Sequence, residues 1–365
     1  MKINQIEPFI SENESKALSS YLSSGGWLTE FKKTKEFEKK IANYVGAKHS
    51  VIVPSGTTAL YLSLLSIGIG PGDFVAVPNY TMIASINAIK WTGAEPIICD
   101  VDPYNLCLDL NSLAPHLNKL KAIIYVQING RSGDMREVVD FCNNNNLLLI
   151  EDSAQAMGSC FKNKFFGTFG DLGVYSLTPH KIITTGQGGV IVTNNSSYYS
   201  KVCSLKDFSR IKPGVDIHNN IGYNFKFTDL QSVVGIEQMN TIEFRVNKKR
   251  KIYNDYFSNL KSIDQIEFFD TDLSQVTPWA IDIVLKSKKI RDGLADFLGK
   301  KSVGTRVFYP ALNSQKPYAE YKKGSFPVSE SISERGLWLP SSIGLSNIEI
   351  DFVCENITEY FTNLD

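Results

Sequence analysis

Short apolar runs separated by stretches of helical spacing fill the first half of the chain. Runs of this kind stand at residues 49–53, 74–77, 96–101, 122–128, 147–150, 174–177 and 190–193. Segments with helically spaced apolar positions follow the first four runs, at 60–65, 83–91, 110–117 and 135–142. Because strands that alternate with helices usually pair in parallel, with helices on both faces, the pattern predicts an α/β fold with a mostly parallel sheet.

The pattern changes toward the C-terminus, where strands are fewer and shorter. In this part, helices are predicted at 237–256 and 290–298 and strands near 280–284 and 305–310. Two more helices, at 12–22 and 34–45, are predicted before the first strand. A chain of 365 residues is long enough for one large domain and a smaller one. We therefore expect a large domain over 1–240 and a small C-terminal domain over 241–365.

One strand end carries the residues that suggest chemistry. The run 147–150 stops at Glu151-Asp152, and Lys181 follows the next predicted strand after a Pro-containing turn. Ligands of open α/β sheets bind at the carboxyl ends of the strands. A lysine in a dry pocket has its ammonium form disfavoured, so its neutral amine can condense with an aldehyde. An aspartate can keep a pyridinium nitrogen protonated. Asp152 and Lys181 are therefore candidates for a pyridoxal phosphate (PLP) site, although a surface loop is the ordinary place for a lysine.

A second candidate site lies at the end of the first strand. The turn Ser55-Gly56-Thr57-Thr58 joins this strand to a helix. Free backbone N–H groups and the dipole at a helix N-terminus favour an anion, so the turn is a candidate phosphate site. The turn could equally be an ordinary helix cap by Ser55 or Thr57. Beside Asp152 and Lys181, the phosphate interpretation is favoured.

These motifs resemble those of a known enzyme family. The residues that carry the resemblance are Glu151-Asp152-Ser-Ala-Gln155-Ala, Gly170-Asp171, Ser176-x-x-Pro179-x-Lys181 and Gly186-x-Gly188-Gly189. In order and spacing they are similar to the DegT/DnrJ/EryC1/StrS sugar aminotransferases, and further matches extend over nearly the whole chain. The resemblance implies the type I fold of PLP enzymes, in which a mostly parallel large domain carries a smaller C-terminal α+β domain.

The resemblance also implies roles for individual residues. Lys181 would bond covalently to PLP and move protons, and Asp152 would hold the pyridinium proton. The residues implied to contact the ring or the phosphate of PLP are Ser55, Gly56, Thr57, Thr58, Gln155, Ser176 and Asn224. In the family the Asn224 position reaches the phosphate of a neighbouring subunit, which implies a homodimer with shared active sites. Met82 stands where the family has an aromatic residue over the ring; a thioether can also cover an aromatic face, and Tyr80 could replace it if its side chain turns inward.

The substrates are implied by the same resemblance. Family members commonly take the amine from glutamate and give it to a nucleotide-linked 4-keto-6-deoxy sugar for surface glycans. The stretch Thr305-Arg306-Val-Phe-Tyr309-Pro looks most like that of members that make GDP-perosamine. Arg306, Tyr309 and Asn313 are therefore candidate substrate contacts. Arg306 could equally make a structural salt bridge, and Asn313 replaces a histidine of the family.

Two other functions within PLP chemistry stay open. Some members of the family are sugar 3-dehydratases, in which histidine replaces the lysine, and His180 stands directly before Lys181. A PLP-binding regulatory protein without turnover is the other alternative. The intact pair Asp152 and Lys181 favours the aminotransferase over both.

Composition excludes several partners. The formal net charge is +0, which offers no attraction to nucleic acid or to an anionic membrane. No apolar run approaches the length of a membrane span, and the N-terminus lacks the apolar core of a signal peptide. Six cysteines without paired spacing predict reduced thiols in the cytosol. The four histidines are isolated in the sequence, so no metal site is predicted.

Overall fold

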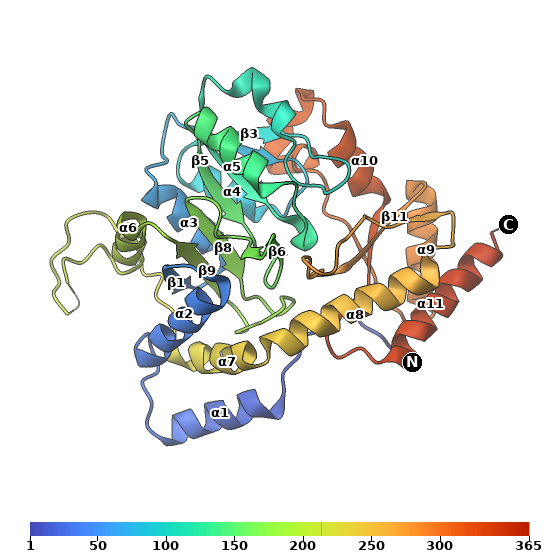
Figure 1. The fold of residues 1–365 in the computed structure, drawn as a ribbon, viewed down its shortest axis with the longest axis horizontal. Helices are drawn as coiled ribbons and strands as arrows, with labels where there is room; N and C mark the ends of the chain where they lie inside the picture. The colour runs from blue at the N-terminus through green and yellow to red at the C-terminus, as the bar shows by residue number, and fades with distance from the viewer. Residues whose placement is uncertain (213, 365) are drawn as a thin grey trace.

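The centre of the molecule is a seven-stranded sheet (Figure 1). The computed structural model describes residues 1–212 and 214–364. The strand order is β1-β9-β8-β5-β4-β2-β3. The bounds of these strands are β1 His49–Val53, β2 Phe74–Pro78, β3 Glu95–Cys99, β4 Leu120–Val126, β5 Leu148–Asp152, β8 Leu172–Ser176 and β9 Gly189–Thr193. Strands β3, β2, β4, β5 and β8 pair in parallel, and β9 runs antiparallel to both β8 and β1. The predicted α/β fold with a mostly parallel sheet is confirmed.

Both faces of this sheet are covered, which explains its nearly continuous apolar strands. In β1, Val51 and Val53 belong to the apolar cluster that includes α3 (Gly56–Ser66). Ile52 points the other way and belongs to the cluster with α2 (Lys32–Val45) and α7 (Asp229–Asn240). Further helices of this part are α1 Glu12–Ser23, α4 Ala84–Trp91, α5 Met135–Asn144 and α6 Ser196–Lys206.

Helices α2 and α7 pack closely because the sequence leaves room at one position. The ring of Phe37 on α2 is fully buried. A Cβ atom on Gly235 of α7 would lie 2.3 Å from that ring, so a glycine is required there. The Thr228 side chain accepts a hydrogen bond from the N–H of Gln231, and this cap starts α7.

Two helix predictions were wrong in detail. The segment expected as one helix over 237–256 is two helices, because α7 ends at Asn240 and α8 (Ile242–Leu260) begins after a break at Thr241. Thr241 has φ −114° and ψ 15°, and its hydroxyl accepts a hydrogen bond from Arg245 Nε at 2.9 Å. The segment expected as a helix over 110–117 is a 3-10 helix, Leu110–His116, with Pro115 inside it. A proline in this segment lacks the N–H that an α-helix needs.

A small antiparallel sheet forms the C-terminal part. Its strand order is β10-β11-β13-β12, with bounds β10 Ile266–Glu267, β11 Ile281–Leu285, β13 Gly336–Leu339 and β12 Arg306–Val307. The helices beside it are α8, α9 Lys288–Lys300, α10 Pro327–Arg335 and α11 Asn347–Thr362, and α8 reaches this part from α7 (Figure 1). The remaining elements are the hairpin strands β6 Cys160–Phe161 and β7 Lys164–Phe165 and the 3-10 helices Ile128–Gly130, Leu312–Ser314 and Lys316–Lys323.

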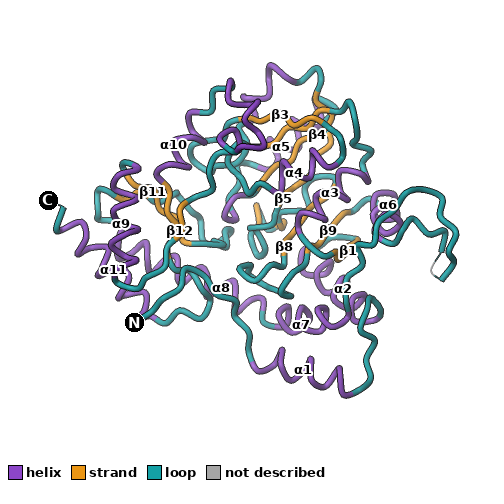
Figure 2. Tube along the Cα trace, turned by 180° about the vertical axis from the view of Figure 1, so that it is seen from behind, coloured by secondary structure: helices purple, strands orange, loops and turns teal. Residues whose placement is uncertain are grey.

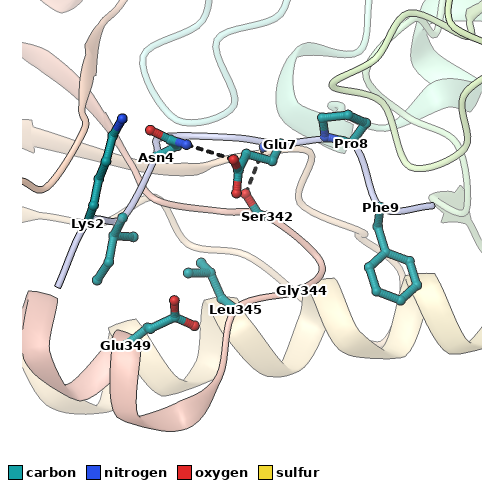
Figure 3. Close-up of a pocket in the computed structure, with 10 residues that line it drawn as sticks. Lys2, Asn4, Glu7, Pro8, Phe9, Ser342, Gly344, Leu345 and Glu349 are labelled. Atoms are coloured by element: carbon teal, nitrogen blue, oxygen red, sulfur yellow. Dashed lines mark hydrogen bonds between the residues drawn. The ribbon is translucent and has the colours of Figure 1, made fainter. Parts of the chain in front are cut away.

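The first residues of the chain pack against this C-terminal part. Ile3 pairs in parallel with Val303, and both chain termini lie at this end of the molecule (Figure 2). The N–H of Glu7 donates to Ser342 Oγ at 2.8 Å. A pocket of about 130 Å³ remains between the N-terminal segment and the loop after β13 (Figure 3). Among the described residues, no helix is long and apolar enough to cross a membrane, and the six cysteines are free thiols.

A buried lysine lies beside this N-terminal segment. Lys249 of α8 is 2% exposed, and its Nζ donates to the carbonyl of Ser341 at 2.6 Å. Among the described residues, no carboxylate lies within ion-pair distance of this amine. Burial therefore lowers the pKa of Lys249 to about 7.

We expect Lys249 to make stability depend on pH. A lysine in the unfolded chain titrates near pH ~10.4, so between pH ~7 and ~10 the unfolded state binds a proton that the folded state lacks. The free energy of unfolding should therefore rise with pH in that window, by up to about 1.4 kcal/mol per unit. Lys249→Met should be about 2–4 kcal/mol more stable than wild type near pH ~6, with the difference shrinking toward pH ~9. Urea unfolding at a series of pH values measures the free energy of unfolding of both proteins. The exposed Lys261→Met is the control, and parallel pH profiles of Lys249→Met and wild type would contradict the expectation.

Candidate active site

Asp152 and Lys181 lie at the same edge of the large sheet. Asp152 is the last residue of β5, and Lys181 stands in the turn that follows the neighbouring parallel strand β8. The N–H of Lys181 donates to the carbonyl of Thr178 at 3.0 Å, which closes this turn. Burial lowers the pKa of Lys181 to about 8, the carboxylate of Asp152 acts against this fall, and the charge of Arg306 adds to it. Both residues of the predicted pair therefore lie at the same edge of the sheet.

Asp152 is a buried carboxylate with two donors. Its Oδ2 accepts a hydrogen bond from Ser85 Oγ at 2.8 Å, and its Oδ1 accepts one from the N–H of Ala154 at 3.2 Å. Burial raises the pKa of Asp152, and the hydrogen bonds and the charge of Lys181 act against that rise. Ser85 lies on α4, 67 positions before Asp152 in the sequence.

Lys181 is covered by an aromatic side chain from another part of the chain. Its Nζ lies 4.4 Å from the centre of the Trp279 ring. Trp279 is 5% exposed, and its indole N–H donates to the carbonyl of His180 at 2.8 Å. No motif in the sequence marks Trp279, because only the folded chain brings it to Lys181.

The turn after β1 lies against the end of β8. Ser55 caps α3, since its Oγ accepts a hydrogen bond from the N–H of Thr58 at 3.1 Å. A Cβ atom on Gly56 would lie 3.2 Å from the Cβ of Ser176, the last residue of β8. The N–H groups of Gly56 and Thr57 lie in the first turn of the helix, where intrahelical acceptors are lacking. Because Gly56 lies close to Ser176, the free N–H groups of the first turn and the hydroxyl of Ser176 lie near one another. Such a group of donors suits a dianion.

Gln155 and Tyr309 are in hydrogen-bond contact at the same edge. The side chain of Gln155 accepts from the N–H of Asn129 at 2.8 Å and donates to Tyr309 Oη at 3.4 Å. Met82 is 46% exposed, and its Sδ accepts from the N–H of Ala84 at 3.0 Å. Tyr80 does turn inward: it is buried, and its ring lies 5.7 Å from that of Phe308.

The three candidate substrate contacts occupy different environments. Arg306 is exposed, and its guanidinium lies over the rings of Tyr309 (5.7 Å) and Trp338 (5.5 Å). Among the described residues, Arg306 forms no ion pair. Trp338 packs against Trp279, the ring that covers Lys181, so Arg306 lies near the amine. Burial lowers the pKa values of His180 and Lys181, and the charge of Arg306 lowers them further.

Asn313 and Asn224 lie in other surroundings. Asn313 is buried, with its side-chain oxygen accepting from Asn79 Nδ2 at 3.0 Å and its Nδ2 donating to Glu330 at 2.8 Å. Asn224 is exposed and lies on the segment between α6 and α7, where its backbone pairs with Asp207. The structure therefore groups Arg306 and Tyr309 with Lys181, whereas the side chain of Asn313 is already engaged within the protein.

The chain is similar to known proteins over nearly its whole length. The model of the DegT/DnrJ/EryC1/StrS aminotransferase family matches residues 8–358. The chain belongs to this family. It is 34% identical to the GDP-perosamine synthase of Escherichia coli O157:H7 over 98% of both chains. It is 32% identical to that of Vibrio cholerae, over 97% of this chain and 98% of the other. The crystal structure of the aminotransferase TlmJ from Streptoalloteichus hindustanus is similar with a TM-score of 0.93 and 28% identity, over 99% of both chains.

The site of this DegT/DnrJ/EryC1/StrS aminotransferase fits PLP, the cofactor of the family. The donor set has the three parts that the cofactor needs, namely an amine of lowered pKa, a buried carboxylate and a helix N-terminus beside small residues. Lys181 and Asp152 supply the first two, and the turn Ser55–Thr58 with Ser176 supplies the third. The specific contacts of these residues with PLP remain predictions. Among the described residues, no group of acidic, histidine or cysteine side chains is arranged to hold a metal.

Glu151 beside Asp152 holds the edge of the site together. Its fully buried carboxylate accepts hydrogen bonds from the N–H groups of Gly167 (2.8 Å), Phe169 (2.6 Å) and Gly170 (2.7 Å), and from Gln127 Nε2 (2.8 Å). In the sequence, Glu151 stands out only as part of a motif. A polar residue directly before the candidate aspartate, in an otherwise apolar strand, was the available signal.

We expect Glu151→Gln to destabilise the fold by about 2–4 kcal/mol, because an amide leaves buried backbone donors without an acceptor. Urea unfolding with an unchanged m-value would measure the loss. Glu137→Gln on the exposed side of α5 is the matched control and should stay within about 0.5 kcal/mol of wild type. A wild-type midpoint for Glu151→Gln would contradict the role of this carboxylate.

Proposed function

We propose that this PLP-dependent aminotransferase moves an amino group from glutamate to a nucleotide-linked 4-keto-6-deoxyhexose, for a surface polysaccharide. The observation that carries the proposal is the 34% identity to a GDP-perosamine synthase over 98% of both chains. A GDP-linked sugar is therefore the first acceptor to test. The exposed guanidinium of Arg306 beside Lys181 supports an anionic substrate, such as a donor carboxylate or a nucleotide diphosphate.

Different residues of the site would transfer protons, protonate the ring nitrogen and bind the phosphate. When bound, PLP supplies an electrophilic carbonyl and an electron sink. With a pKa of about 8, Lys181 is partly neutral near neutral pH, so its Nζ can accept a proton from the substrate carbon and return it. The buried Asp152 would hold a proton on the ring nitrogen. The turn Ser55–Thr58 and Ser176 would bind the phosphate and fix the ring relative to Lys181.

The two substrates react in separate halves of the cycle. In the ping-pong order of a covalent carrier, glutamate gives up its amine and leaves as the oxo acid before the keto-sugar binds. Lys181 moves protons in both halves, in opposite directions. Arg306 lies at the open side of the site, where both substrates would enter.

The test is to supply glutamate and a set of nucleotide-linked 4-keto-6-deoxy sugars and to identify the products by mass spectrometry. We expect one oxo acid for each amino sugar formed, with a GDP-linked acceptor preferred over others. Lys181→Ala is the control that should form neither product. A sugar that loses water without gaining nitrogen would instead indicate the 3-dehydratase. The exposed position of His180 disfavours that activity. PLP binding without any product would indicate the regulatory protein.

We also propose a homodimer that shares its active sites. Asn224 is exposed at the base of the segment between α6 and α7, where its backbone pairs with Asp207, and this segment stands away from the body of the molecule (Figure 1). The same segment exposes Ile217 (58%) and Ile221 (85%), apolar surface that a partner subunit would cover. Light scattering should give the mass of two chains.

Mixing two inactive variants tests the sharing of sites. Lys181→Ala and Asn224→Ala disable different halves of a shared site, so mixed dimers would contain one intact site. We expect activity to recover after the two variants are mixed and allowed to exchange subunits. No recovery, with mixed dimers present, would mean that Asn224 serves its own subunit.

A further inference from the structure

Trp279 makes two contacts with the Lys181 segment. The Nζ of Lys181 lies 4.4 Å from the ring centre, and the indole N–H donates to the carbonyl of His180 at 2.8 Å. Trp279 thus contacts both the reacting amine and the backbone directly before it. Among the hydrogen bonds of the described residues, none is made by Lys181 Nζ. The indole is therefore the contact that defines where this amine lies.

The position of the indole is itself fixed from two sides. The ring packs edge-on against Trp338 of β13, with centroids 5.5 Å apart. The backbone next to Trp279 is tied to the large sheet, because the N–H of Ala280 donates to Asn129 Oδ1 at 2.7 Å. Asn129 follows β4, and Trp338 belongs to the small sheet. Trp279 is thus held where the two sheets meet.

A cation above an indole is stabilised by the negative face of the ring, and the effect grows when water is excluded. A free lysine side chain has many rotamers, so an amine that must return to one reacting atom benefits from a fixed position. A carboxylate in hydrogen-bond contact would hold the ammonium strongly and suppress its neutral form. An aromatic face attracts the ammonium but forms no strong hydrogen bond with its N–H groups, so the neutral amine stays accessible.

We propose that Trp279 is a positioning residue that holds the free amine of Lys181 over its indole face whenever that amine is not bonded to the cofactor or to a proton-transfer partner. The inference rests on the role proposed for Lys181. Asp152 also favours this ammonium through its charge, although among the described residues it makes no hydrogen bond or ion pair with Lys181 Nζ. Burial and the charge of Arg306 lower the pKa of Lys181 and so disfavour its ammonium form.

The test measures the amine directly, without substrate or turnover. The full-length protein is freed of PLP, treated with an acylating reagent over a range of pH, and the modification of Lys181 is followed by peptide mass mapping. The variants are Trp279→Leu, which loses the ring, and Trp279→Phe, which keeps an aromatic face but loses the N–H. Trp91→Leu is the matched control, because Trp91 is an exposed tryptophan on α4. Circular dichroism checks that each variant is folded.

We expect the labelling midpoint of Lys181 to fall by about one pH unit in Trp279→Leu and by less in Trp279→Phe. Trp91→Leu should match wild type. A midpoint in Trp279→Leu that is unchanged, or that rises because water reaches the amine, would overturn the proposal. If Trp279→Leu does not fold, Trp279→Met replaces it as the variant without an aromatic ring, and an unchanged midpoint in that variant would overturn the proposal. A failure of the sugar assay with the predicted shift present would reject the proposed acceptor and keep the role of Trp279.

Discussion

Replacing Lys181 with alanine should lower the rate of amino transfer by about 10⁴-fold or more, the largest effect that we expect from any single substitution. Lys181 is the amine at the shared edge of β5 and β8, and its pKa of about 8 leaves it able both to accept and to give a proton near neutral pH. Alanine offers neither a covalent partner nor a proton carrier. The fold should persist, because among the described residues Lys181 Nζ makes no hydrogen bond or ion pair that alanine would remove.

The measurement is production of the oxo acid from glutamate, with stability followed in parallel. A small primary amine added to Lys181→Ala should restore part of the rate if the lost function is proton transfer. Lys162→Ala, at an exposed lysine beside the β6–β7 hairpin, is the matched control and should keep the wild-type rate. Turnover of Lys181→Ala within tenfold of wild type would show that another group does the chemistry.

The strands and the Asp152–Lys181 pair could be predicted because their signals are local. The run that became β5 is apolar up to its end and then turns acidic, and β1 has the predicted bounds His49–Val53. Parallel strands place their carboxyl ends at one edge, so the meeting of Asp152 and Lys181 followed from topology alone. Residues whose roles come from the family resemblance, such as those of the turn after β1, could also be located at a strand end from the sequence. Their contacts with PLP and substrate stay predictions.

The partners of these residues could not be predicted, because they come from distant parts of the chain. Ser85 reaches Asp152 across 67 positions, and Trp279 reaches His180 across 99. Neither side chain lies in a motif that marks chemistry. Asn313 shows the reverse case, since a position noted for its chemistry is engaged by Asn79 across 234 positions. Tertiary packing sets such contacts, and a single sequence carries little information about it.

Asp152→Asn should lower the rate of amino transfer by about 10³-fold, the second large effect that we expect. The amide keeps the shape of the carboxylate and can still accept a hydrogen bond from Ser85, so the fold should be retained. What is lost is the negative charge that would hold a proton on the ring nitrogen. Ser85→Ala is the control: it removes one hydrogen bond but keeps the charge, and it should cost the rate much less than the loss of the carboxylate.

The same substitution should also change Lys181 in the absence of PLP. Asp152 is the group that raises the pKa of Lys181 against burial and Arg306, so the labelling midpoint of Lys181 in Asp152→Asn should fall below pH ~8. A lost rate with an unchanged midpoint would place the effect of Asp152 on the cofactor alone. A wild-type rate would remove Asp152 from the mechanism. Because Asp152 and Trp279 stabilise the same ammonium from different elements, Asp152→Asn combined with Trp279→Leu should lower the midpoint further than either substitution does.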